Sequence, residues 1–308
     1  MTPADQFLSS LDRSWKEFSG AWKKARMDAS EKSIHHLRVS TRRLIATLEL
    51  TRRLARRAEI PELQRGLKKV LKRIGPLRDV QVQLKTVSKL RQAGVVGEFK
   101  RTLERRERRE VKDIRNELER RRKRRLREGA RDLRSEFARL HEKAAPEKIQ
   151  RSVEKTLNQC RNAFLKAYRQ FQPADGESLH NMRIALKELR YSLEAAEPVL
   201  GRSVKARARE MQALQQLLGD TRDLELLRVV LEKWASRKGK KIAIAPALDI
   251  LAEKRISLMQ KIAESAAVFE NIIPAEALKP ASEKTHAVAA PAVDKDPAKT
   301  GRPRAAAG

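Results

Sequence analysis

Apolar residues recur at intervals of three and four along most of the chain, and polar residues occupy the positions between them. This spacing places the apolar side chains on one face of an α-helix. No segment shows the alternation of apolar and polar residues that is typical of a strand. Prolines and glycines interrupt the pattern and predict helices over residues 4–27, 31–58, 61–93, 96–143, 147–171, 176–199, 203–237 and 243–271. We therefore expect an all-α fold.

Two segments depart from this simple pattern. Residues 274–308 are rich in Ala, Pro and Lys and lack an apolar stripe, so we expect a disordered tail with weak electrostatic contacts. Residues 105–137 are dense in charge, but acidic and basic residues alternate at helical spacing beside an apolar seam. That pattern is typical of a long solvated helix, in which the run RRRKRR at 120–125 would widen a basic surface.

Two motifs occur twice, in the same order and at nearly the same separation. The segment IHHLRVSTRRLIATLEL at 34–50 returns 145 positions later as LHNMRIALKELRYSLE at 179–194. The segment LKRIGPLRDV at 71–80 returns 144 positions later as QQLLGDTRDL at 215–224. Two motif pairs with almost the same offset indicate an internal duplication. We expect two related four-helix units, at about 5–145 and 146–272, with antiparallel neighbouring helices.

The first motif places cations on one stripe of its helix. At about 100° per residue, Arg42 lies within about 40° of His35, and Arg38 about 60° from it. The leucines form an adjoining apolar stripe, which is the natural core face. The polar stripe of the second copy contains His180, Arg183, Lys187, Tyr191 and Glu194. Because cations recur in register beside the core stripe, the pattern favours an anion site over a merely solvated face.

Carboxylates accompany both motifs. Asp79 and Asp223 each follow an arginine in the second motif, and they have two interpretations. They could serve metal or acid–base chemistry, or they could orient an arginine of the nearby motif helix. We favour the orienting role, and we expect the same supporting role for Glu49 and Glu194.

Metal and nucleotide sites find little support in the sequence. His35 and His36 are adjacent on a helix and point about 100° apart, so they do not chelate together. Cys160 is the only cysteine, which argues against a disulfide framework or a thiolate zinc site. Gly75 and Gly219 are expected to permit close helix approach, since neither lies in a glycine-rich phosphate loop. We expect no metal and no cofactor.

Charge narrows the class of partner. The 308 residues include 70 Lys and Arg against 40 Asp and Glu, a formal net charge of +30 that indicates a polyanionic partner. Aromatic residues make up only 4% of the chain, too few for the stacking platforms of single-strand binders. Nucleic acid is therefore disfavoured. No run of about 18 apolar residues predicts a membrane span, and we expect a soluble cytoplasmic protein.

The two motif pairs resemble the paired signatures of the CHAD family, an α-helical domain named for its histidines. The resemblance covers about residues 5–272, and both halves carry both motifs in family order. It implies two four-helix bundles with pseudo-twofold symmetry around a basic central cavity. It further implies binding of inorganic polyphosphate in that cavity, and association with polyphosphate granules as in some members.

Carried over by position, the family's binding set falls on His35, Arg38, Arg42 and Arg43 in the first copy and on His180, Arg183, Lys187, Arg190 and Tyr191 in the second. Neighbouring helices would add Lys72, Arg78 and Arg222. Two departures weaken the first-half site: Ile45 stands where the first motif usually has another arginine, and Glu188 stands at the position of Arg43.

The leading hypothesis is a non-enzymatic polyphosphate-binding module. A basic scaffold associated with nucleic acid is the alternative. A phosphotransferase, with His35 or His180 accepting a phosphoryl group, or a metal-binding protein is less favoured, because no acidic cluster is present to hold a metal ion. Oligomeric state does not follow from the sequence.

Overall fold

The computed structural model describes residues 3–54, 59–90, 94–120, 146–173, 175–201 and 203–265, and these contain helices and no strand. The all-α prediction is confirmed. The helices are α1 (Pro3–Asp28), α2 (Glu31–Leu54), α3 (Glu59–Val87), α4 (Val95–Arg120), α6 (Pro146–Arg169), α7 (Gly176–Leu200), α8 (Lys205–Arg237), the 3₁₀ turn η1 (Ile242–Ile244) and α9 (Ala245–Glu264).

Most described helix boundaries follow the sequence prediction to within a few residues, but the helix expected to run to residue 93 ends at Val87. Local chemistry explains several of them: the Ser30 hydroxyl accepts a hydrogen bond from the Ser33 amide at 3.2 Å and caps the start of α2. Gly201 ends α7 in the left-handed region at φ 64°. Pro76 lies inside a continuous α3. The predicted tail at 274–308 and residues 121–125 lie outside the described residues.

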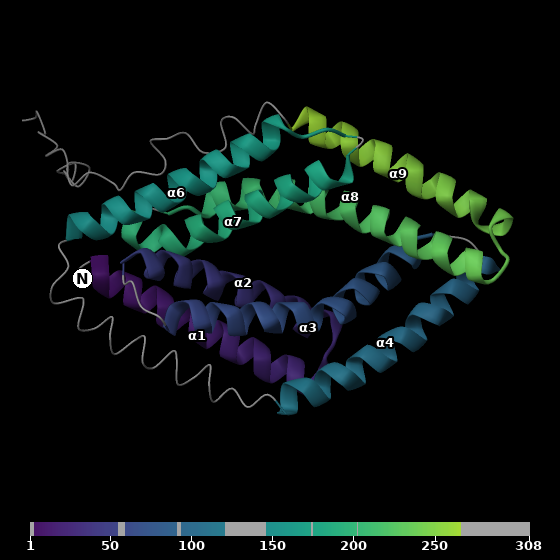
Figure 1. Ribbon diagram of the computed structural model, residues 1–308, viewed down its shortest axis with the longest axis horizontal. Coiled ribbons are helices and arrows are strands. Elements are labelled where there is room, and N and C mark those ends of the chain that lie inside the picture. Colours follow the sequence, from purple (N-terminus) through teal and green to yellow (C-terminus); the bar gives the residue numbers. More distant parts are fainter. Residues whose placement is uncertain are drawn as a thin grey trace, which may run out of the picture.

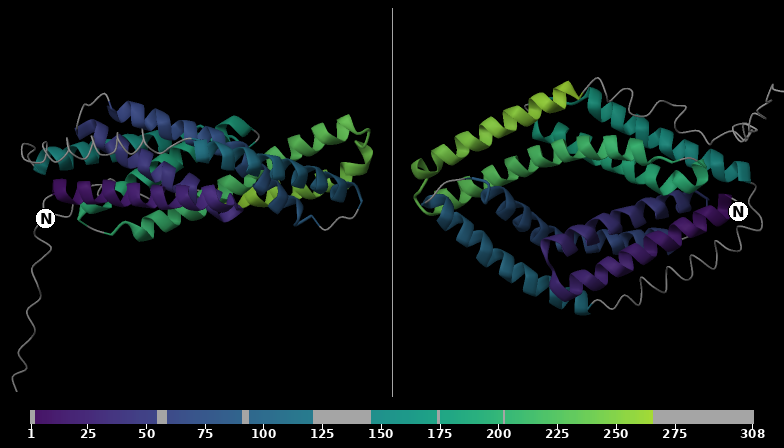
Figure 2. Two further views of the ribbon diagram at one scale, coloured as in Figure 1. Left: turned by 90° about the horizontal axis from the view of Figure 1, so that it is seen from below. Right: turned by 180° about the vertical axis from the view of Figure 1, so that it is seen from behind.

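The helices form two rows that meet along α2 and α7 (Figure 1). In one row α1, α2, α3 and α4 pack successively, and in the other α6, α7, α8 and α9 do so. Contacts between α2 and α7, α1 and α7, and α3 and α8 join the rows. Figure 2 shows the two rows from two further sides. The two helices that carry the first motif are therefore direct neighbours.

Two apolar cores hold these rows together, and α8 takes part in both. Leu214 and Leu218, in the first half of α8, pack with the core of α6 and α7. Leu227 and Leu231, in its second half, pack with the core of α1 to α4. One continuous helix thus fixes the position of α7 relative to α3. The expected boundary between two related units near residue 145 stays a prediction.

Candidate functional site

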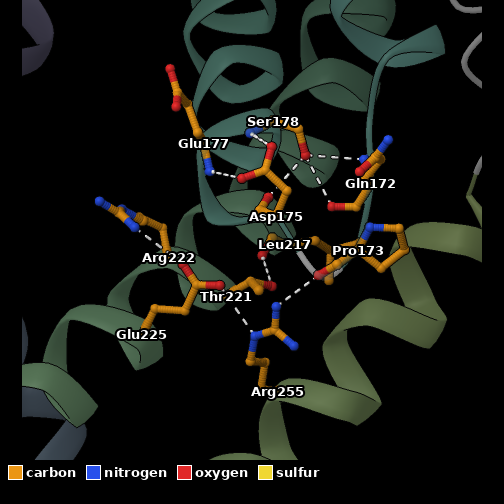
Figure 3. A network of polar contacts seen from close by, with 10 residues as sticks. All are labelled: Gln172, Pro173, Asp175, Glu177, Ser178, Leu217, Thr221, Arg222, Glu225 and Arg255. Carbon is orange, nitrogen blue, oxygen red and sulfur yellow. Dashed lines mark hydrogen bonds and ion pairs between the residues drawn. The ribbon is translucent and has the colours of Figure 1, made fainter.

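The start of α7 is fixed by a polar network that reaches α8 and α9 (Figure 3). The carboxylate of Asp175 accepts hydrogen bonds from the amides of Glu177 at 2.9 Å and Ser178 at 3.0 Å, which satisfies two donors of the first turn. The Ser178 hydroxyl donates to the carbonyl of Gln172 at 2.9 Å, and the Gln172 amide donates back to it at 3.0 Å. The loop and the helix that carries His180 therefore form one rigid unit.

Glu225 of α8 links this network to two cations. Arg222 donates to it at 3.2 Å, and Arg255 of α9 donates to its other oxygen at 3.2 Å. Arg255 also donates to the carbonyl of Pro173 at 2.7 Å, so α9 is tied to the loop before α7 (Figure 3). Gly176 lies so near that a β-carbon there would come within 3.4 Å of Glu225. Arg222 is thereby held beside the start of the motif helix.

The start of α2 has a comparable arrangement. Arg78 of α3 donates to Glu31, in the first turn of α2, at 3.0 Å, and Lys85 lies 3.6 Å from the same oxygen. The Gln81 amide donates to the carbonyl of Ala29 at 3.2 Å. As on the other side, an arginine of the second motif is held near the first turn of a motif helix by a glutamate. Neither Glu31 nor Glu225 was among the residues singled out from the sequence, although Glu225 stands three residues after Arg222.

In the middle of the two motif helices, four cations lie close enough for their charges to interact. We call Arg38, Arg42, Arg183 and Lys187 the α2–α7 cation cluster. Burial, with the neighbouring charge of Arg42, lowers the pKa of Arg38 to about 10. Burial lowers the pKa of Lys187 to about 6, and the charges of Arg183, Arg42 and Arg38 act in the same direction. Burial likewise lowers the pKa of Arg183. Cations from both halves of the chain thus repel one another within one partly buried group.

Two aspartates moderate this repulsion. Asp79 acts against the lowering of the Arg38 pKa, and both Asp79 and Asp223 act against that of Arg183. Burial raises the pKa of Asp223 itself, with Asp220 adding to the effect, although Arg183 opposes it. The orienting role expected for the two aspartates stays a prediction. Two carboxylates near four cations still leave an excess of positive charge.

A glycine lies next to each of the two motif arginines, Arg38 and Arg183. A β-carbon on Gly75 would stand 4.0 Å from Nη1 of Arg38, and one on Gly219 would stand 3.9 Å from Nε of Arg183. Each guanidinium therefore lies against the backbone of the helix that carries the second motif. The glycines were expected to permit close helix approach, and in the structure the approaching group is a guanidinium.

Both motif histidines lie at the edge of the cation cluster. Burial lowers the pKa of His35, and the charges of Arg78 and Arg38 add to this effect, while Glu31 opposes it. Burial also lowers the pKa of His180, with Arg222, Arg183 and Lys187 adding to the effect. Nδ1 of His180 and Nε of Arg183 are buried and have no hydrogen-bond partner among the described residues. A buried polar atom without a partner costs free energy, which a ligand would recover only after the side chain turned toward it.

Three members of the predicted set lie elsewhere, around Glu194. Arg43 donates to Glu194 at 3.0 Å and lies 3.5 Å from Glu17 of α1. Arg190 is buried, lies 3.2 Å from the same glutamate and places its guanidinium 4.5 Å from the ring centroid of Tyr191. We call these residues the Glu194 cluster; it borders an open cavity of about 310 Å³. Here carboxylates already neutralise the cations.

The family model of the CHAD domain matches residues 9–232. The chain belongs to the CHAD domain family. A crystal structure of the CHAD domain from the plant Ricinus communis is similar, with a TM-score of 0.62 and 20% identity over 88% of this chain and 90% of that one. PptA from Streptomyces chartreusis has a TM-score of 0.59 and 16% identity, covering 88% of this chain and 99% of its own. No curated protein matches the chain.

The resemblance drawn from the motifs is thus confirmed, and the solved structures share the CHAD fold. The match to the CHAD domain ends before α9, yet Arg255 of α9 helps to hold the start of α7. Lys72 is exposed on α3, and its place in the binding set stays a prediction. Glu49 pairs with Arg52 at 2.7 Å and accepts a hydrogen bond from Gln64 at 3.1 Å, and its expected role in supporting the motif arginines stays a prediction.

The described residues contain neither a metal-binding group nor a membrane-spanning helix. Among the residues that the structure describes, no group of three or more His, Cys, Asp or Glu side chains could hold a metal ion. None of the helices in these ranges is long and apolar enough to cross a membrane. What the described part of the CHAD domain offers chemically is a set of positive donors.

Proposed function

We propose that this protein binds inorganic polyphosphate without turning it over, and that the α2–α7 cation cluster is its principal contact. The observation that carries the proposal is the burial of Lys187 among three arginines, which lowers the pKa of this lysine to about 6. Holding like charges together costs folding free energy that an anionic ligand would recover. Sites of this kind are candidates for function on physical grounds.

The chemistry of the cluster suits phosphate groups. Arginine forks bind phosphate oxygens bidentately, and Lys187 supplies a point charge that becomes positive when an anion approaches. Nδ1 of His180 is buried without a hydrogen-bond partner among the described residues, and Arg78 and Arg222 extend the positive edge. The cluster contains no aromatic residue on which a base could stack, which favours an inorganic chain over nucleic acid.

We also propose that the two motif helices derive from an internal duplication and face a shared basic cavity with pseudo-twofold symmetry. The paired relations of Arg38 with Gly75 and of Arg183 with Gly219 support this proposal. A polymer that contacts both copies gains affinity from its length, because the second contact is intramolecular. Polyphosphate granules would then recruit the protein, which imaging of a fluorescent fusion in cells with and without polyphosphate would test.

A competition titration tests the ligand. Long-chain polyphosphate and duplex or single-stranded DNA are titrated against the protein at several salt concentrations. Polyphosphate should bind more tightly at physiological salt, with an affinity that falls as salt rises because each contact releases counterions. Equal or tighter binding of DNA would overturn the proposed ligand. Intact chain lengths after incubation with magnesium, and unlabelled protein, are expected for a module without catalysis.

Paired variants test the site. Arg38→Gln with Arg183→Gln should weaken polyphosphate binding by about a hundredfold, since each charge-assisted contact is worth about tenfold. Arg65→Gln with Arg169→Gln removes the same charge from exposed positions on α3 and α6 and should change affinity far less. Similar losses in both pairs would show that net charge alone drives binding.

The net charge of +30 keeps a basic nucleic-acid scaffold as the second candidate. That alternative depends on residues 120–125 and 274–308, whereas the cation cluster does not. Deleting both segments should leave polyphosphate affinity nearly unchanged. A large loss after the deletions would favour the scaffold.

A further inference from the structure

A second group of cations lies between α4 and the last turns of α8, at the end of the molecule where α4 begins (Figure 1). Side chains of the two helices border an open pocket of about 700 Å³. The cations that line it are Arg105, Arg108, Arg109, Arg237 and Lys238. None of them belongs to the repeated motifs.

Unlike the cations of the Glu194 cluster, these cations are not paired with carboxylates among the described residues. Within the described ranges, no carboxylate lines the pocket, and none forms an ion pair with the five cations. Arg105 donates to the Thr102 hydroxyl at 3.4 Å. Glu98 is a nearby acid, and both of its oxygens accept from Lys240 at 2.7 Å. Among the described residues the pocket therefore carries an excess of positive charge, although Lys238 lies close enough to Glu98 to help lower the pKa of that carboxyl group.

Trp234 adds a second, independent observation. It lines the pocket, and its Nε1 is buried without a hydrogen-bond acceptor among the described residues. A buried donor of this kind costs about 1–3 kcal/mol when it stays unpaired. The Trp234 ring packs against Phe99 with centroids 5.4 Å apart. Because Phe99 covers part of the ring, the pocket offers positive charge but a poor platform for stacking a base.

We propose that this α4–α8 pocket is a second anion site, which binds the phosphate groups of inorganic oligophosphates. Three arginines of α4, Arg237 at the end of α8 and Lys238 directly after it surround the anion. The guanidinium groups and the lysine ammonium group donate to its oxygens. Apolar residues of α4 and α8 belong to the same core, which holds the two sides of the pocket near each other.

The position of the pocket would allow one long ligand to contact both groups of cations. Arg222, at the edge of the α2–α7 cation cluster, and Arg237, in the pocket, lie on the same continuous helix. Their separation of fifteen residues corresponds to about 22 Å along the axis. A polyphosphate long enough to span this distance would engage both groups and gain affinity through effective concentration. This consequence rests on the proposed function, whereas the pocket itself does not.

Tripolyphosphate, too short to bridge the two groups, is the probe for the experiment. The protein is labelled with ¹⁵N in its indoles, and the Nε1–H resonance of Trp234 is assigned by its loss in Trp234→Phe. Addition of tripolyphosphate should shift this resonance and leave those of Trp15 and Trp22 in place, because these two pack within the core.

Two double variants separate this proposal from the proposed function. Arg105→Gln with Arg109→Gln should weaken the titration seen at Trp234 by about tenfold or more. Arg38→Gln with Arg183→Gln should leave it unchanged, even if the cation cluster no longer binds. Lys112→Gln with Arg115→Gln removes the same charge from α4 outside the pocket and is the matched control.

Three outcomes would overturn the α4–α8 site. They are an unmoved Trp234 resonance in the native protein, equal weakening in the pocket and control variants, and displacement of tripolyphosphate by an equal phosphate concentration of single-stranded RNA. Loss of the signal only in Arg38→Gln with Arg183→Gln would assign it to the cation cluster and would also contradict the proposal.

Discussion

The Nε atom of Arg183 lies 3.9 Å from the position that a β-carbon would occupy on Gly219. The guanidinium thus lies against a strip of α8 backbone that carries no side chain. Arg38 and Gly75 have the same relation in the other half of the chain, at 4.0 Å. In both places, a glycine of one helix lies next to the arginine of its neighbour.

Substitutions at Gly219 should separate stability from binding. In Gly219→Ala the methyl group makes an ordinary contact, and the helix gains about 0.5–1 kcal/mol because glycine is a poor helix former. Gly219→Met places a long side chain where the guanidinium lies, and polyphosphate affinity should fall by about tenfold as one charge-assisted contact is lost. Denaturant unfolding and a binding titration measure the two effects. Unchanged affinity in Gly219→Met would show that Arg183 does not need this position.

The helices could be predicted from the sequence because apolar periodicity reports directly on the buried face of each helix. The stripe of Arg38 and Arg42 followed from the same geometry, and the structure places both beside Arg183 and Lys187. Arg43 was grouped with them only through the family resemblance. It points about 100° away from Arg42, toward α1 and α7.

Contacts between distant segments could not be predicted in this way. Arg43 and Glu194 stand 151 positions apart, and their ion pair depends on how α2 crosses α7. The α4–α8 pocket likewise depends on where α8 ends relative to α4. Its arginines looked like an ordinary solvated face in the sequence. Periodicity defines the face of one helix, whereas the pairing of two faces is set by packing.

Glu194 should matter for stability, because it neutralises two cations at once. In Glu194→Ala, Arg190 stays buried without its partner, and breaking a buried pair in this way costs about 3 kcal/mol. Glu232 is the control, since it pairs with an arginine that is half exposed, and Glu232→Ala should cost less than about 1 kcal/mol. Urea unfolding of both variants gives the comparison. Equal small losses would show that water already screens Arg190.

Lys187 makes the unbound protein sensitive to pH. Its pKa falls from the ordinary 10.5 to about 6, so between these values the unfolded chain carries a proton that the folded chain does not. The free energy of unfolding should therefore rise as pH increases from 6 toward 10.5, and should not depend on Lys187 below 6. The lowered pKa values of His35 and His180 add a rise near neutral pH, whereas the raised pKa of Asp223 acts at lower pH.

Lys187→Met tests this dependence. It should be more stable than the native protein near pH 7 and should show a flatter profile between pH 7 and 9. Lys72→Met removes an exposed lysine and should leave the profile unchanged. Urea midpoints measured at three pH values provide the test, and parallel profiles for the native protein and Lys187→Met would contradict it.

Binding of polyphosphate should draw protons from solution. An anion beside Lys187 stabilises its charged form and raises its pKa, so at pH 7.5 about one proton is taken up per binding event. Calorimetry in two buffers with different ionisation enthalpies measures this uptake, and affinity should fall as pH rises above 6. In Lys187→Arg the charge is permanent, so binding should persist while this contribution to proton uptake disappears. Identical heats in both buffers for the native protein would mean that Lys187 is already charged, or that the ligand lies elsewhere.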